Sequence, residues 1–167
     1  DPPVLLMDEP FGAVDPVVRV RLQDEFLRLQ RELGKTVVLV THDIDEAVRM
    51  GDRVAIFATG GRLAQFATPA ALLARPADDF IADFVGSERG LRRLTVTQID
   101  PAHLEPLDGV RAGELGAAID VDSTLEEALA AMLRDDKPMV GVKDGARFVG
   151  VLTPNGVHRA LRASLAE

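Results

Sequence analysis

The sequence predicts an α/β protein in which a parallel βαβ unit and a hairpin precede a second, smaller α/β domain. Continuous apolar runs at residues 4–7 and 36–40 have the length and composition of strands buried on both faces. A helical pattern separates these runs, and alternating strand and helix patterns return from Ile119 onward. Strands that alternate with helices favour parallel sheets with helical crossovers. These observations define the expected fold class.

The pattern between the two runs is that of an amphipathic helix. Pro16 suits a first helical turn and Gly34 a C-cap, and apolar residues follow one another at helical spacing with charged residues on the other side. The apolar positions are Val18, Leu22, Phe26, Leu29 and Leu33. A strand, helix and strand in this order predict two parallel strands joined by a right-handed crossover.

Glycine and proline residues mark the ends of the next predicted elements. Asp43 is placed to cap a short helix, with Glu46 three residues later in the manner of a capping box and Gly51 at its end. Residues 53–58 and 62–67 flank a Thr-Gly-Gly turn and predict a hairpin. Helices are expected at 69–73 and 78–85, which completes a first domain over residues 1–86.

The remainder divides into a loose segment and an ordered one. Residues 87–116 carry scattered proline and glycine without a sustained period, which indicates a linker or a partial regulatory element. Residues 117–167 predict a small domain in the order β-α-β-β-α, with its first helix at 125–133, its later strands at 139–142 and 148–152, and a final helix at 155–165.

Composition excludes several classes of protein. The formal net charge of -8 argues against a non-specific nucleic-acid binder, whose affinity depends on Lys and Arg. The absence of cysteine excludes disulfides and thiolate metal sites. No apolar run approaches the roughly 20 residues of a membrane span, and no signal peptide is evident. We therefore expect a cytoplasmic or peripheral protein. Because Asp1 is not a start methionine and a strand begins almost at once, we also expect a fragment of a longer chain.

Acidic and histidine residues follow the two predicted parallel strands. Asp8 and Glu9 leave the first strand, and Thr41, His42 and Asp43 leave the second. Ligands of open α/β sheets bind beyond the carboxyl ends of strands, so both loops should face one crevice. Neighbouring residues on a strand point in opposed directions, which gives Asp8 and Glu9 different partners. Phosphoryl transfer to water needs this division, with one carboxylate for Mg²⁺ and one for the attacking water.

At these residues the chain resembles ABC-type ATPases. Residues 4–10, Val-Leu-Leu-Met-Asp-Glu-Pro, are similar to the Walker B segment, residues 11–15 to the D-loop, and residues 40–43, Val-Thr-His-Asp, to the switch-histidine loop. The resemblance implies that Asp8 holds Mg²⁺ through water, Glu9 is the general base and His42 senses the γ-phosphate of ATP. It also implies that Asp15 lies at the interface between two ATPase subunits.

Simpler interpretations of the same residues stay open. An Asp-Glu-Pro sequence after a strand is also a common solvated turn, and a histidine there can be merely structural. Asp43 is best explained as a helix cap, and Asp15 has a helix start as its alternative explanation, because aspartate is common there.

Two ATPase motifs are absent from the sequence. It has no Gly-x-x-x-x-Gly-Lys-Ser/Thr phosphate loop, and Gly60-Gly61 lies in a hairpin without the lysine. The Leu-Ser-Gly-Gly-Gln motif that the family carries upstream of Walker B is absent too. We therefore expect ATP and Mg²⁺ to act in an intact subunit, and this chain alone neither to bind MgATP tightly nor to hydrolyse it.

Further segments resemble the ATP-binding subunits of importers for glycine betaine, carnitine, choline or proline. They are residues 22–26, 41–47, 79–86 and 89–91, and the likeness covers residues 1–96. The resemblance implies a homodimer of ATPase subunits on the inner face of the plasma membrane. It further implies contact with transmembrane permease subunits, an indirect link to a substrate-binding protein, and no nucleic-acid partner.

The C-terminal segment resembles one cystathionine-β-synthase-type (CBS) motif. Residues 124–128, Thr-Leu-Glu-Glu-Ala, match the start of its helix, and residues 150–153, Gly-Val-Leu-Thr, match its last strand. By the resemblance Thr153 is a candidate nucleotide contact. CBS motifs normally act in pairs, so we expect this one to pair either with residues 92–116 or with another subunit. The family places a ribose-binding aspartate three residues after the threonine, where this chain has Gly156, so a structural or dimerising role is also open.

Three functions are therefore compatible with the sequence. The first is a transport ATPase subunit, incomplete here. The second is a regulatory or dimerisation CBS module that carries an inert ATPase remnant. The third, a DNA-repair ABC ATPase, is disfavoured by the acidic charge and by the CBS-like segment.

Overall fold

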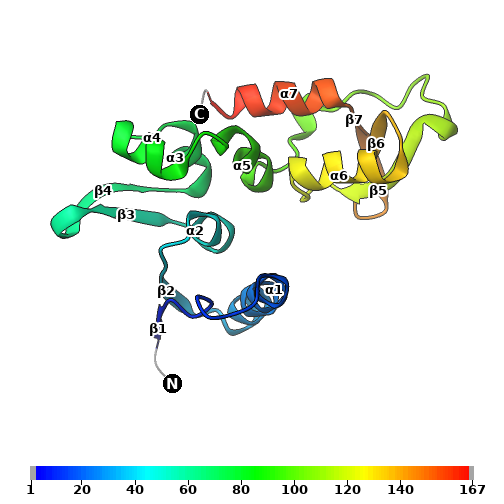
Figure 1. Cartoon of the computed structure of the whole chain (residues 1–167). Coiled ribbons are helices and arrows are strands. Elements are labelled where there is room, and N and C mark those ends of the chain that lie inside the picture. The colour runs from blue at the N-terminus through cyan, green and yellow to red at the C-terminus, as the bar shows by residue number, and fades with distance from the viewer. Residues whose placement is uncertain (1–2, 166–167) are drawn as a thin grey trace. The chain divides into compact units, whose positions relative to one another are not determined.

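The computed structural model of the chain describes residues 3–165, which form two compact units that divide between Pro69 and Ala70. The first unit contains the βαβ motif and the hairpin, and the second contains a three-stranded sheet with its helices (Figure 1). The domain boundaries expected from sequence at residues 86 and 116 stay a prediction.

The first unit begins with the predicted βαβ motif. Strand β1 (Val4–Asp8) is followed by helix α1 (Pro16–Leu33) and strand β2 (Thr36–Val40). The strands pair in parallel, from Val4 opposite Thr36 to Asp8 opposite Val40. The prediction of two parallel strands joined by a helix is confirmed, and both strands end at the same edge of their sheet.

The ends of α1 follow from its sequence. The Asp15 carboxylate accepts a hydrogen bond from the Val17 N–H at 2.9 Å, and Pro16 occupies the first turn, where its missing N–H costs nothing. At the other end Gly34 has a φ of 61° and donates its N–H to the Gln30 carbonyl. This left-handed cap favours glycine, as the sequence predicts.

The rest of the first unit also matches expectation. Helix α2 (Ile44–Met50) follows β2, and strands β3 (Val54–Ala58) and β4 (Arg62–Ala67) form an antiparallel hairpin around the short 3₁₀ turn η1 (Thr59–Gly61). The inward side chains of β3, Val54 and Ile56, are buried.

One expectation for the first unit is wrong. The apolar runs suggested strands buried on both faces, but Leu6 is 74% exposed and Val40 55%. In the described chain β1 and β2 form a two-stranded sheet, so each has an open edge and little cover. The apolar stripe of α1 is likewise exposed at Val18, Leu22, Leu29 and Leu33, while the polar Gln23 of the same helix is buried.

The second unit contains the predicted β-α-β-β-α order. Its strands are β5 (Leu115–Asp120), β6 (Met139–Asp144) and β7 (Arg147–Leu152), with β5 parallel to β6 and β6 antiparallel to β7. Helix α6 (Leu125–Asp135) connects β5 to β6, and α7 (Pro154–Ala163) follows β7.

Further helices precede this sheet. Helices α3 (Pro69–Ala74) and α4 (Asp79–Val85) lie where the sequence predicts them. Helix α5 (Arg89–Val96) and the 3₁₀ turns η2 (Pro101–His103) and η3 (Ala112–Glu114) lie in the segment expected to be loose. That segment also pairs with the sheet region, because Glu105 and Val151 exchange two backbone hydrogen bonds of 2.9 Å. The segment is therefore more structured than a linker.

The core of the second unit lies between α6, α7 and the sheet. Helix α6 starts at a full capping box, in which the Thr124 hydroxyl accepts from the Glu127 N–H and the Glu127 carboxylate accepts from the Thr124 N–H. The buried residues of this core are Ile99, Leu125, Ala128, Ala131, Met132, Val140, Val142, Leu152, Val157 and Ala160. This part of the chain thus has its own hydrophobic core.

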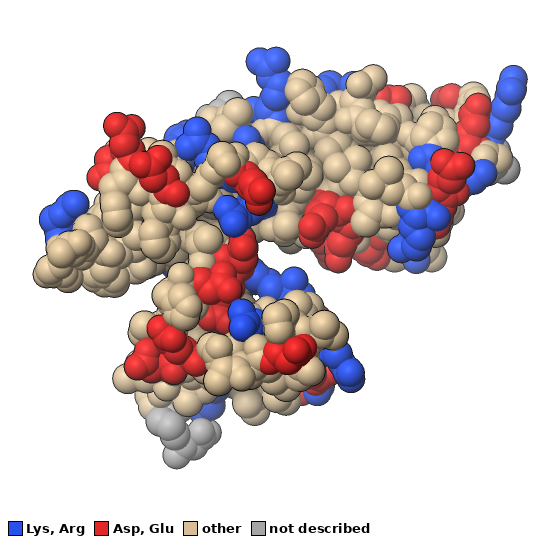
Figure 2. All heavy atoms as spheres, viewed as in Figure 1, with Lys and Arg blue, Asp and Glu red and all other residues tan. Residues whose placement is uncertain are grey.

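The surface of the described residues carries charged side chains of both signs. Lys and Arg side chains are interspersed with Asp and Glu on the face shown in Figure 2, without one continuous basic area. Within residues 3–165, no helix is long and apolar enough to cross a membrane.

The contact between Gly150 and the 104–105 segment predicts a stability effect. A Cβ at Gly150 would lie 2.8 Å from the Leu104 Cβ and 2.9 Å from the Glu105 carbonyl oxygen. Gly150→Ala should therefore force these two residues away from β7 and lower the free energy of unfolding by about 1–3 kcal/mol.

Urea denaturation followed by far-UV circular dichroism measures this effect, since the chain has no Trp or Tyr. Gly113→Ala is the matched control, because nothing lies within 4 Å of an added Cβ there. Equal unfolding midpoints for the two variants would contradict the prediction.

Candidate functional site

The first candidate residues lie where β1 and β2 end. Asp8 is the last residue of β1 and is exposed opposite Val40, the last residue of β2. Glu9 follows with a φ of 43°, which is uncommon for a residue other than glycine. Its N–H donates to the Val40 carbonyl at 2.8 Å. The chain therefore turns directly after Asp8 while it remains bonded to the neighbouring strand.

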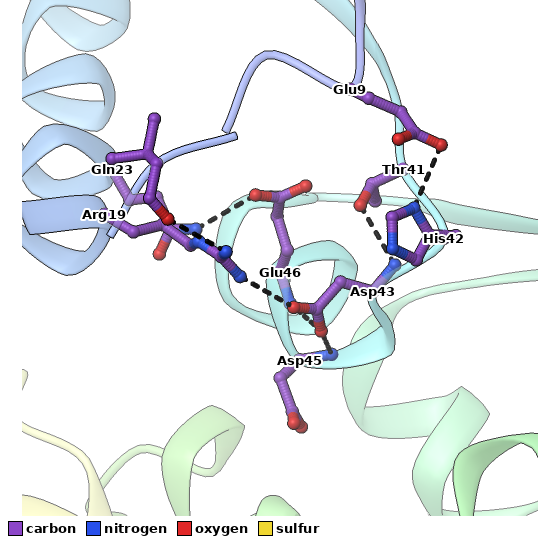
Figure 3. A network of polar contacts seen from close by, with 9 residues as sticks. Glu9, Arg19, Gln23, Thr41, His42, Asp43, Asp45 and Glu46 are labelled. Carbon is purple, nitrogen blue, oxygen red and sulfur yellow. Dashed lines mark hydrogen bonds and ion pairs between the residues drawn. The ribbon is translucent and has the colours of Figure 1, made fainter. Parts of the chain in front are cut away.

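Glu9 and His42 contact each other across this edge. The Glu9 Oε1 lies 2.9 Å from the His42 Nδ1, and both side chains are at least half exposed (Figure 3). Hydrogen bonding and charge attraction from Glu9 raise the pKa of His42 above its usual 6.5, with Asp43 and Glu46 adding smaller charge effects. The structure thus brings together the two residues that sequence reasoning assigned as general base and γ-phosphate sensor.

The loop that carries His42 is anchored on both sides of it. The Thr41 hydroxyl accepts from the Asp43 N–H at 3.0 Å, and the Asp43 Oδ1 accepts from the backbone N–H groups of Asp45 and Glu46. The prediction that Asp43 caps α2 is confirmed. The capping box is not formed, because Thr41 accepts from the Asp43 N–H while the Glu46 carboxylate accepts from Gln23.

The segment from Glu9 to Asp15 is held by local turns. The Gly12 N–H donates to the Glu9 carbonyl at 3.2 Å, and the Val14 N–H donates to the Phe11 carbonyl at 3.1 Å. Phe11 is buried and packs edge-to-face on Phe26 of α1, with ring centroids 6.4 Å apart. Asp15 is exposed and caps α1. Its capping role is therefore observed, and its place at a subunit interface stays a proposal.

Sequence reasoning missed a set of polar contacts between α1 and the start of α2. The Gln23 amide donates to the Glu46 Oε1 at 3.0 Å, and both residues are buried. Arg19 donates to the Val14 carbonyl and forms an ion pair with Asp43 (Figure 3). The sequence shows an arginine and a glutamine four residues apart on one helix, which could have indicated these contacts. Hydrophobic periodicity alone, however, predicts that both side chains face solvent.

The side chains at the strand ends do not form a closed metal site. No cluster of three or more His, Cys, Asp or Glu side chains among residues 3–165 could enclose a metal ion. Mg²⁺ usually keeps several waters and binds through one or two carboxylates together with substrate phosphates. An exposed carboxylate such as that of Asp8 fits this mode.

Thr153 has a structural role in the second unit. Its hydroxyl caps α7 by accepting from the Gly156 N–H at 3.1 Å and lies 3.1 Å from the Glu105 carboxylate. A Cβ at Gly156 would lie 2.9 Å from the Leu152 Cδ1 and 3.2 Å from the His103 carbonyl oxygen. An aspartate at position 156 would therefore not fit without rearrangement, and nucleotide binding by Thr153 stays a prediction.

The Glu9–His42 contact predicts a change in histidine titration. Glu9→Gln removes the carboxylate that favours the imidazolium form, so the pKa of His42 should fall toward 6.5. Because the pKa is raised in the folded state, stability from this contact is present below the unfolded pKa and is lost as pH rises through the folded pKa.

NMR titration of the three histidines measures the change, with His42→Gln to identify the resonance. Glu32→Gln, which alters an exposed carboxylate on α1, is the control. A pKa of His42 that Glu9→Gln leaves at the wild-type value would contradict the assignment of the contact.

Known proteins resemble most of this chain. The chain is 61% identical over 94 residues to the osmoprotectant import ATP-binding protein OsmV of Salmonella typhimurium, which covers 56% of the chain and 24% of that protein. It is 42% identical over 135 residues to the choline transport ATP-binding protein OpuBA of Bacillus subtilis, with 81% of the chain and 33% of that protein covered.

The similarity extends through the second unit in a further relative. The glycine betaine/proline betaine transport system ATP-binding protein ProV of Salmonella typhimurium is 33% identical over 163 residues, or 96% of the chain and 38% of its own length. No family profile matches the chain. The chain thus spans about a quarter to two fifths of the length of these relatives, and its homologues are ATP-binding subunits of importers for osmoprotectants.

Proposed function

We propose that this chain forms part of an ATP-hydrolysing subunit of an ABC importer for osmoprotectants such as glycine betaine, carnitine, choline or proline. The observation that carries the proposal is the contact of Glu9 with His42 at the shared end of two parallel strands. Homology to transport ATP-binding proteins supports it independently of the geometry.

In this proposal the residues at the strand ends divide the work of phosphoryl transfer. Asp8 would hold Mg²⁺ through water, and the ion, when bound, would supply positive charge near the phosphates. Glu9 orients and deprotonates the attacking water, and His42 contacts the γ-phosphate. The hydrogen bond to His42 fixes the direction of the Glu9 carboxylate, which positions this general base before the nucleotide arrives.

The same proposal also names the proteins with which the subunit assembles. Asp15 faces a second ATPase subunit in a homodimer, and the subunit docks on transmembrane permease subunits at the inner face of the plasma membrane. A substrate-binding protein delivers the solute to the permease. The sequence similarity to importers for choline and betaines is the support for this assembly.

We propose further that residues 1–167 alone do not hydrolyse ATP. The sequence contains neither a phosphate loop nor the Leu-Ser-Gly-Gly-Gln motif. A P-loop supplies the backbone N–H groups and the lysine that hold the phosphates, and the strand ends described above do not provide either.

Isothermal titration calorimetry of the chain with MgATP, together with a phosphate-release assay, tests this proposal. We expect no micromolar binding and no turnover above a heat-denatured control. Micromolar affinity for MgATP, accompanied by ATP hydrolysis, would contradict the proposal that the chain is inactive alone.

A second test concerns the intact subunit. Glu9→Gln should lower the rate of ATP hydrolysis by about 10²–10⁴-fold, the range typical for loss of a general base, with ATP affinity largely retained. Glu25→Gln, an exposed change on α1, should leave the rate unchanged. An equal loss in the two variants, or none in either, would speak against Glu9 as the base.

A second candidate function is a regulatory or dimerisation module of the CBS type. It is favoured by the separate hydrophobic core of the second unit and by its β-α-β-β-α order. Analytical ultracentrifugation of the chain at low and high ionic strength distinguishes the two, because a dimerisation module predicts self-association without nucleotide. A chain that stays monomeric at all concentrations would remove this candidate.

A further inference from the structure

Arg19 connects the two loops that carry the candidate site. It is the fourth residue of α1, and its Nη2 donates to the Val14 carbonyl at 3.1 Å. Its Nη1 lies 3.5 Å from the Asp43 Oδ2. Val14 belongs to the loop that follows Glu9, and Asp43 directly follows His42. One guanidinium therefore bridges the segments on both sides of the Glu9–His42 contact (Figure 3).

The Asp43 carboxylate is shared between this bridge and the helix cap. Its Oδ1 accepts from the N–H groups of Asp45 and Glu46, which leaves Oδ2 for Arg19. The two oxygens thus fix the loop against α2 and against α1 at the same time. His42 lies between this anchored aspartate and Thr41, so its backbone has little freedom to move away from Glu9.

The surroundings of Arg19 favour a fixed position for the side chain. Only 27% of it is exposed, against 53% for Arg28 farther along the same helix. Its Nε is buried without a hydrogen-bond partner among the described residues, a cost that the two Nη contacts offset. One helical turn later, the buried contact of Gln23 with Glu46 makes a second link between α1 and α2.

We infer that Arg19 is a positioning residue that couples the 11–15 loop to the His42 loop and thereby holds His42 against Glu9. A role for Arg19 in catalysis rests on the proposed function. The coupling of the two loops does not, because it can be measured on this chain without nucleotide. A guanidinium suits the task because its planar fork carries a hydrogen-bond donor for the Val14 carbonyl and, on a second nitrogen, positive charge for the Asp43 carboxylate. Movement of either loop would then be passed to the other through this side chain.

The test replaces Arg19 by Met, which keeps the length of the side chain and removes every donor. NMR titration of His42 without nucleotide reports the coupling. Loss of a nearby cation by itself would raise the pKa of His42, as would an unpaired Asp43. Loss of positioning instead weakens the Glu9 contact, so we expect the pKa to fall toward 6.5, and Arg19→Lys to recover part of the shift.

Arg28→Met is the matched control, because Arg28 is on the same helix and also bridges two acidic residues, Glu25 and Glu32. It should leave the His42 pKa unchanged. An unchanged or raised pKa in Arg19→Met, or an equal fall in Arg28→Met, would overturn the inference.

Circular dichroism establishes that the variants are folded, and Arg19→Gln replaces Arg19→Met if the latter is not. Loss of folding in both would also overturn the inference, because Arg19 would then be required for the fold itself. Since no nucleotide is present, the outcome is independent of whether the subunit hydrolyses ATP.

Discussion

The candidate site depends on the parallel pairing of β1 with β2. The register sets Asp8 opposite Val40, and the Glu9 N–H extends the ladder by one further bond to Val40. A slip of one residue would shift Glu9 by about 3.3 Å relative to β2, which is too far for its 2.9 Å contact with His42 to be kept. The strand register is therefore the condition under which Glu9 and His42 meet.

Helix α1 supplies the second constraint, because it returns the chain from one strand to the other. Its caps at Asp15 and Gly34 fix where it begins and ends. Its buried face is polar as well as apolar: Phe26 packs on Phe11, while Arg19 and Gln23 bind groups of the loop and helix that follow β2. Polar contacts of this kind are directional, so they hold the loops in one arrangement where apolar packing would allow several.

Much of the fold and part of the site could be predicted from the sequence. Strands, caps and the hairpin follow from local signals, and parallel strands place Glu9 and His42 at one edge by topology. The sequence predictions that failed concern residues whose contacts are set by the tertiary structure. Glu46 sits where a capping box would use it, yet its carboxylate binds Gln23, which lies far away in sequence. Helix α5 was missed because the glycine and proline around it conceal a short helical segment.

The backbone at Glu9 shows how the site combines strain with chemistry. A positive φ costs a residue with a side chain about 1–3 kcal/mol, and glycine would avoid that cost. Glycine, however, would supply no carboxylate for His42. The 2.8 Å bond from the Glu9 N–H to Val40 and the turn closed by Gly12 hold the strained conformation in place. Strain that the surrounding structure maintains is found mainly at functional sites, and here it falls on the residue that we propose as the general base.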